Sequence, residues 1–151
     1  MNNEAIKQVI SVLMAHSPYR YKDEDLNKLG QRIGAEFGDV SGRSFLYVLE
    51  SRASESRNSV DLNEIHRRAK MLDDHYTRQY EIARDRYFEH LNTSPSDFRP
   101  SVDFFSMFGA ECMKQETYES KRTELKGHLN DAIRNLPDEI RIGKNIKEVS
   151  E

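Results

Sequence analysis

One stretch of the sequence, residues 61–91, limits the possible folds more than any other. Its apolar residues recur every three or four positions and therefore share one face of an α-helix. They are Leu62, Ile65, Ala69, Leu72, Tyr76, Tyr80, Ala83, Tyr87 and Leu91. Neither Gly nor Pro interrupts the run, and Asp61 and Glu64 can form a capping box at its start. A helix of roughly 46 Å cannot bury this face alone, so other segments or a second copy of the chain must cover it.

Three shorter helices are predicted before this one, within residues 4–53. The first ends before Pro18, because the residue that precedes a proline avoids the helical conformation. The second ends at Gly38, which fits the C′ position where a left-handed residue closes the last turn. Ser41 can cap the third helix. Residues 51–59 are polar and lack periodicity, so they are predicted to form a loop.

Two further helices are predicted as an antiparallel hairpin within residues 101–136. The first is apolar nearly all round, which indicates either deep burial or a face for a partner. Its candidate partner-contacting residues are Phe104, Phe105, Met107 and Phe108. Residues 138–151 are compatible with a disordered tail, a short helix or two short strands around residues 143–145. The sequence thus predicts one all-α domain over residues 1–137, a helical bundle of about six helices organised on one long central helix.

Composition narrows the classes of function. Hydrophobic residues make up 36% of the chain and charged residues 32%, so the core is small or is shared in a dimer. The 23 basic and 26 acidic residues are interleaved at a net charge of −3, which gives no reason to expect tight non-specific binding of nucleic acid. The single cysteine, Cys112, precludes an intrachain disulfide and fits a reducing compartment. Neither a signal-peptide pattern nor an apolar run of membrane-spanning length is present, so we expect a cytoplasmic protein outside the membrane.

Residues 29–49 carry the pattern of a helix-turn-helix. Gly34 would be the small residue at the contact between the two helices, and Gly38 the glycine of a turn one residue longer than usual. The residues that would face the major groove of DNA are Ser41, Arg43, Ser44 and Tyr47. Residues 1–60 carry eight basic and eight acidic side chains, so the local field is neutral. An ordinary corner of two packed helices is therefore the favoured interpretation, and DNA recognition is the alternative.

The first half of the chain also has a characteristic order of segments. A first helix ends at a turn with an aromatic residue and a proline, residues 15–19 (AHSPY). A second helix, a short third helix and a polar loop then precede the acidic cap in residues 59–65 (SVDLNEI). This order resembles the N-terminal helical domain of phage replicative helicase loaders and loader-inhibitors over about residues 4–70, without the tryptophan common in that family's second helix. The resemblance implies a small protein that binds another protein of the replication machinery.

No pattern indicates catalysis, a cofactor or a metal. The histidines do not pair at metal-ligand spacing on one helix face, and HExxH and phosphate-binding glycine motifs are missing from the sequence. The best carboxylate–imidazole neighbours are His75 after Asp73 and Asp74, and His128 one turn after Glu124. Solvated histidines are the simpler interpretation, and mixed charges including Asp73 are expected on the solvated face of the long helix. We therefore expect a protein that is not an enzyme.

These patterns together predict a non-catalytic interaction or regulatory protein that binds a protein partner through helical surfaces. An accessory factor of a phage or mobile element would fit this description. The long apolar stripe and the small core make a homo-oligomer the expected state. The alternatives are a helix-turn-helix transcriptional regulator that binds DNA, a replication accessory protein similar to helicase loaders or their inhibitors, and an enzyme or metal protein built around His75 or His128.

Overall fold

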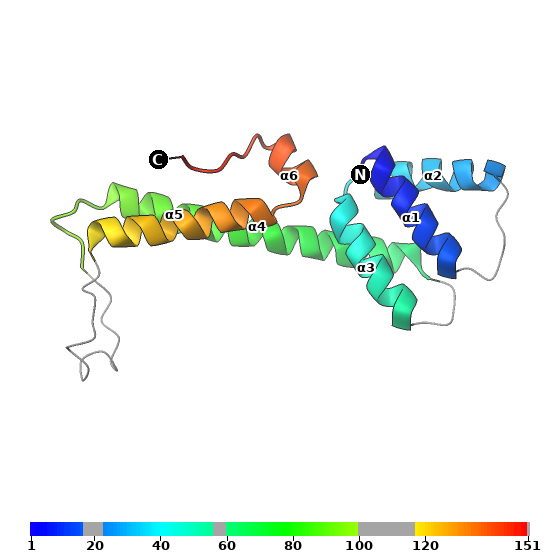
Figure 1. Ribbon diagram of the computed structural model, residues 1–151, viewed down its shortest axis with the longest axis horizontal. Helices are drawn as coiled ribbons and strands as arrows, with labels where there is room; N and C mark the ends of the chain where they lie inside the picture. Colours follow the sequence, from blue (N-terminus) through cyan, green and yellow to red (C-terminus); the bar gives the residue numbers. More distant parts are fainter. Residues whose placement is uncertain (17–22, 56–59, 100–116, 151) are drawn as a thin grey trace. The chain divides into compact units, whose positions relative to one another are not determined.

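The computed structural model describes residues 1–16, 23–55, 60–99 and 117–150, and within these ranges the chain is all-α, as predicted. Figure 1 shows the helices, and no strand occurs in the described part of the chain. They are α1 (Asn3–His16), α2 (Asp23–Phe37), α3 (Gly42–Glu55), α4 (Leu62–Asn92), α5 (Tyr118–Asn135) and α6 (Asp138–Gly143). The predicted helix with Phe104, Phe105, Met107 and Phe108 lies outside the described residues.

Helix α4 confirms the long central helix and starts as its cap predicts. The carboxylate of Asp61 accepts a hydrogen bond from the backbone N–H of Asn63 at 3.0 Å. Glu64 does not complete the predicted capping box. Its carboxylate instead pairs with Arg52 of α3 at 2.5 Å, because a guanidinium is a stronger donor than a backbone amide.

The chain forms two compact units that share α4. The N-terminal unit consists of Met1–Thr77 and Leu136–Ile146, and the C-terminal unit consists of Arg78–Asn135 and Lys147–Glu151. The first unit therefore contains α1, α2, α3, α6 and the first half of α4. The second contains the last half of α4, α5 and the end of the tail. Among the described helices, none combines the length and apolarity needed to cross a bilayer.

The core of the N-terminal unit forms where α1 packs on both α2 and α3, with the first half of α4 alongside. Its buried side chains are Val9, Ile33, Phe37, Val40, Phe45, Leu49, Ile65 and Ala69. The rings of Phe37 and Phe45 lie 5.7 Å apart between centroids and join the end of α2 to α3. Ile65 and Ala69 belong to the apolar face predicted for residues 61–91. Burial of each large apolar side chain in this core stabilises the fold by about 1.5–3 kcal/mol.

The structure corrects the roles predicted for two glycines. No glycine among the described residues has a positive φ, so Gly38 is not a left-handed C′ residue. A Cβ at Gly38 would instead collide with the carbonyl oxygen of Gly34, where the chain tightens at the end of α2. Gly34 faces α1 rather than α3, since a Cβ there would lie 3.3 Å from Cδ1 of Ile6. Gly34 therefore serves the approach of α1, not a helix-turn-helix contact with α3.

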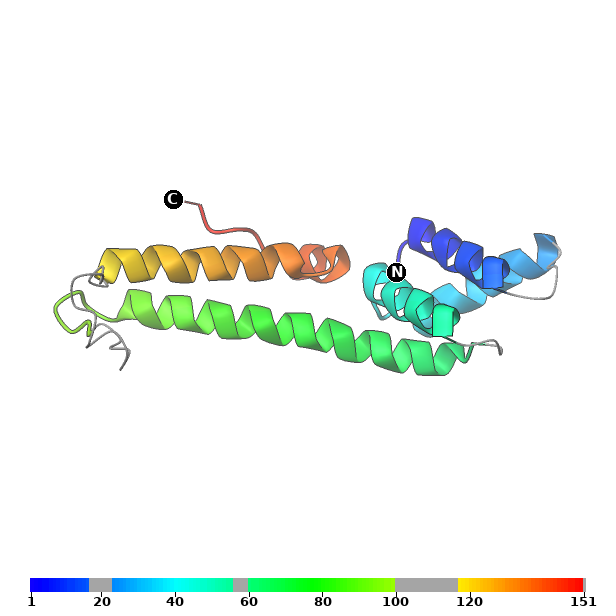
Figure 2. The same ribbon diagram turned by 60° about the horizontal axis from the view of Figure 1, so that its bottom comes forward.

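In the C-terminal unit, α5 runs alongside the last half of α4, as both views show (Figure 2). Tyr87 of α4 and three residues of α5 form its buried core, the latter being Leu125, Leu129 and Ile133. The ring of His90 stacks on Tyr118 at 4.3 Å between centroids and meets Phe98 edge-on at 5.4 Å. These rings cover the helix face that His90 presents, so His90 is buried while Leu91, predicted for the stripe, is exposed.

Helix α6 resolves the alternatives that the sequence leaves open for residues 138–143. It ends in a Schellman motif: the N–H groups of Asn145 and Ile146 bond to the carbonyls of Ile142 and Arg141 at 3.1 and 2.9 Å. Asn145 has a φ of 51°, which asparagine tolerates better than most residues. A short helix, rather than strands, therefore follows Pro137.

Candidate functional site

Two of the residues predicted to contact DNA are buried in a polar network at the start of α3. The hydroxyls of Ser41 and Ser44 each donate to Oδ1 of Asp73 at 2.6 Å, and the backbone N–H of Ser41 donates to Oδ2 at 2.8 Å. Asp73 is only 7% exposed, although the sequence predicts a solvated position for it. Both serines are buried as well. The prediction that they face the major groove is therefore wrong in this fold, because their hydroxyls are enclosed and already bonded.

This network, which we call the α3 cap, is structural in character. The hydroxyl of Ser41 accepts the N–H of Ser44 at 3.2 Å, and Oε1 of Glu139 in α6 accepts the N–H of Gly42 at 3.0 Å. Two carboxylates thus lie at the positive end of the α3 dipole and satisfy its unpaired amides. Both serine hydroxyls are buried and bonded to Asp73, so the cap holds α3 in place and offers no hydroxyl to a substrate.

The other two residues predicted to contact DNA lie at the surface. The guanidinium of Arg43 lies 4.9 Å from the centre of the Tyr76 ring, a cation–π contact between α3 and α4. Tyr47 is 67% exposed. On one side it lines a pocket of about 500 Å³ whose charged lining is mostly acidic, with Glu4, Glu50, Asp138 and Glu139. On its other side lies a second, more apolar depression.

The second depression runs between α3 and α4 and is called the α3–α4 groove here. It has a volume of about 410 Å³. Its lining residues are Tyr47, Val48, Ser51, Arg52, Arg68, Met71, Leu72 and His75. Val48 and Leu72 are half-buried, whereas Tyr47 and Met71 are 67% and 60% exposed. Two large apolar side chains therefore remain in solvent beside a partly apolar floor, which is the usual composition of a protein-binding patch.

The charged residues that line the α3–α4 groove are both arginines. Arg52 and Arg68 each pair with Oε1 of Glu64, at 2.5 and 3.0 Å. The hydrogen bond from Arg52 is the main cause that lowers the pKa of Glu64 below its ordinary value. Both guanidinium groups thus meet the carboxylate of Glu64 at this edge of the groove.

His75 and His128 are both exposed, in agreement with their interpretation as solvated side chains. His75 meets the ring of Tyr76 edge-on at 5.8 Å, and His128 is exposed on α5. Among the contacts of the described residues, His66 makes a short one with a carboxylate, since its Nε2 lies 2.7 Å from Oδ1 of Asp39. Within the described ranges, no three His, Cys, Asp or Glu side chains gather closely enough to hold a metal ion.

Helical periodicity does not reveal the α3–α4 groove, because Tyr47 and Met71 lie on different helices and meet only in the tertiary structure. A usable signal is that both are large apolar residues outside the core stripes of their helices. The candidate partner-contacting residues Phe104, Phe105, Met107 and Phe108 lie outside the described ranges.

The assignment of this groove as a site thus depends on the residues of the chain itself. In comparisons with protein-family models, curated proteins and solved structures, nothing matches this chain.

Proposed function

We propose that the protein is a non-catalytic interaction protein that binds a protein partner in the α3–α4 groove. The observation that carries this proposal is the exposure of Tyr47 and Met71, at 67% and 60%, beside the half-buried Val48 and Leu72. Exposing two such side chains to water is unfavourable unless a partner covers them. Tyrosine, methionine and arginine are also the residue types enriched at interface cores.

The chemistry of the groove favours one kind of partner. Two helices form its walls, and an amphipathic helix laid between them can insert apolar residues against Tyr47 and Met71. Arg68 at the edge has a side chain that is 45% exposed and favours an acidic residue at the end of that apolar face. Methionine adapts its shape to the side chain it meets, so Met71 accommodates anchors of different outline. The proposed occupant is thus an amphipathic helix with an acidic flank.

A site-specific crosslink tests this assignment. Benzoylphenylalanine is placed at position 47 in one variant and at position 88 in another, and each is irradiated in extract from the native cells with and without nuclease. Phe88 is the matched control because it is an exposed aromatic residue on α4 outside the groove. We expect a protein adduct from position 47 alone, unchanged by nuclease. Equal adducts at both positions, or nuclease-sensitive capture, would contradict the proposal.

The crosslinked protein then permits a quantitative test. Tyr47→Ala and Met71→Glu should each weaken its binding by about 30-fold, the effect of removing one interface hot spot. Phe88→Ala should leave the affinity unchanged, and circular dichroism should show equal helix content in all variants. Unchanged affinity in both groove variants would place the interface elsewhere on the molecule.

A further inference from the structure

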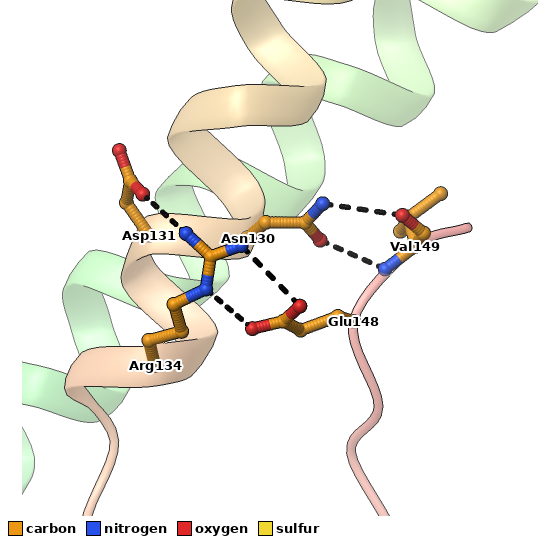
Figure 3. A network of polar contacts seen from close by, with 5 residues as sticks. All are labelled: Asn130, Asp131, Arg134, Glu148 and Val149. Carbon is orange, nitrogen blue, oxygen red and sulfur yellow. Dashed lines mark hydrogen bonds and ion pairs between the residues drawn. The ribbon is translucent and has the colours of Figure 1, made fainter. Parts of the chain in front are cut away.

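The end of the tail lies on α5 as an extended segment held by side chains. Figure 3 shows the amide of Asn130 paired with both backbone groups of Val149: Nδ2 donates to the carbonyl at 3.1 Å, and Oδ1 accepts the N–H at 2.8 Å. This pair of hydrogen bonds is the same pair that a residue of a neighbouring antiparallel β-strand would form with Val149. It recognises an extended backbone whatever side chain that residue carries.

One turn further along α5, Arg134 binds the side chain of the preceding tail residue. Its Nε and one terminal nitrogen reach the two carboxylate oxygens of Glu148 at 2.6 and 3.4 Å, and its other terminal nitrogen pairs with Asp131 at 3.1 Å (Figure 3). The contact with Glu148 is the main cause that raises the pKa of Arg134. A forked pair of this geometry selects a carboxylate over a neutral side chain.

Asn130 and Arg134 are four residues apart and therefore share one face of α5, while Glu148 and Val149 are consecutive. The helix thus contacts two neighbouring residues of an extended chain: it binds the acidic side chain of the first and the backbone of the second. Glu148 and Arg134 remain exposed, at side-chain values of 46% and 59%. Exposed ion pairs hold weakly, so the tail can leave and be replaced.

We propose that Asn130 and Arg134 form a second binding site, which takes an extended peptide with an acidic residue followed by a residue that has a free backbone N–H. The tail residues Glu148 and Val149 occupy the site within the same chain and so inhibit it. The partner is a protein segment of this chemistry that competes with the tail. The site lies in the C-terminal unit, and its existence does not depend on the α3–α4 groove.

The test uses full-length variants and a labelled synthetic peptide of residues 146–150, IKEVS, with blocked ends. The double variant Glu148→Ala/Val149→Pro empties the site, since it removes the carboxylate and the N–H that the tail supplies. We expect this variant to bind the peptide, by fluorescence anisotropy, at least ten times more tightly than the wild type. The tethered tail competes at an effective concentration of about a millimolar in the wild type.

Further variants link the binding to the two side chains. Asn130→Ala or Arg134→Ala, added to the emptied chain, should abolish binding, and Arg122→Ala is the matched control because Arg122 is an exposed arginine of α5 that pairs with Glu119 instead. A peptide with glutamine for the glutamate should bind at least ten times more weakly. Equal binding to wild type and emptied chain, or binding unaffected by Asn130→Ala and Arg134→Ala, would overturn the proposal. A wild-type mass of two chains that falls to one in Val149→Pro would overturn occupancy within the same chain.

Discussion

At the scale of single residues, Asp73 is a buried carboxylate at the centre of a hydrogen-bond network. Its carboxylate accepts two hydroxyls and a backbone N–H from the start of α3. Asp73→Ala leaves these donors buried without an acceptor and should lower the free energy of unfolding by about 2–3 kcal/mol. Asp74→Ala is the control, because Asp74 is exposed and its loss should cost less than about 0.5 kcal/mol. Urea denaturation measures both, and equal effects would show that the α3 cap contributes no stability.

The contact between Asp39 and His66 makes the stability of the protein depend on pH. The hydrogen bond from His66 is the largest cause that lowers the pKa of Asp39 below its ordinary 3.8. A lowered folded-state pKa contributes stability that is present above pH 3.8 and is lost as pH falls through the folded pKa. Since the side chain of Asp39 is 53% exposed, the contribution should be about 0.2–1 kcal/mol.

Carbon-detected NMR of the Asp39 carboxyl measures this directly. We expect its titration midpoint below 3.8 in the wild type and a return toward 3.8 in His66→Ala. The stability difference between wild type and Asp39→Asn should correspondingly shrink below pH 3.8. A midpoint that His66→Ala leaves in place would assign the shift to another group.

At the scale of elements, helix positions follow from local sequence, and their mutual contacts do not. The caps at Asp61 and Ser41 fall where residue type predicts them, because a cap bonds within its own turn. Asp73 is buried by α3, which begins more than 30 residues away, so the sequence pattern of α4 cannot predict this burial. The local sequence around Asn130 cannot predict its site either, because the site needs Val149 of the tail. Sequence therefore predicts the bundle and leaves both candidate binding sites to the tertiary structure.

Two glycines should respond oppositely to replacement by alanine, because one is closely packed and the other has open space beside it. Gly42 is buried, and a Cβ there would collide with Cβ of Ala5 at the contact of α3 with α1. Gly42→Ala should therefore lower the free energy of unfolding by about 1–3 kcal/mol. A Cβ added at Gly127 in α5 would have no neighbour within 4 Å. Gly127→Ala should therefore raise the free energy of unfolding by about 0.5–1 kcal/mol, because alanine has the higher helix propensity. Thermal and urea unfolding compare the pair, and the same sign for both changes would contradict this assignment.

At the scale of the whole molecule, the two units are interwoven along the chain. The chain passes between them within α4 after Thr77, again after Asn135, and a third time after Ile146. The N-terminal unit thus depends on residues 136–146, which reach it only after α5, and Glu139 binds Gly42 across 97 positions. Neither unit consists of one continuous segment, and an unfolded α5 would remove the constraint that returns α6 to α3.

We therefore expect the two units to unfold as one cooperative domain. Leu129→Ala creates a cavity in the core of the C-terminal unit and should cost about 2–5 kcal/mol. In native-state hydrogen exchange, the slowest amides of α3 should lose the same opening free energy as those of α5, because both then exchange through global unfolding. Phe45→Ala, a change in the core of the N-terminal unit, should likewise lower the opening free energy of the slowest amides in both α3 and α5. If Leu129→Ala changes exchange in α5 and leaves α3 untouched, α4 joins two independent units, and the single-domain prediction fails.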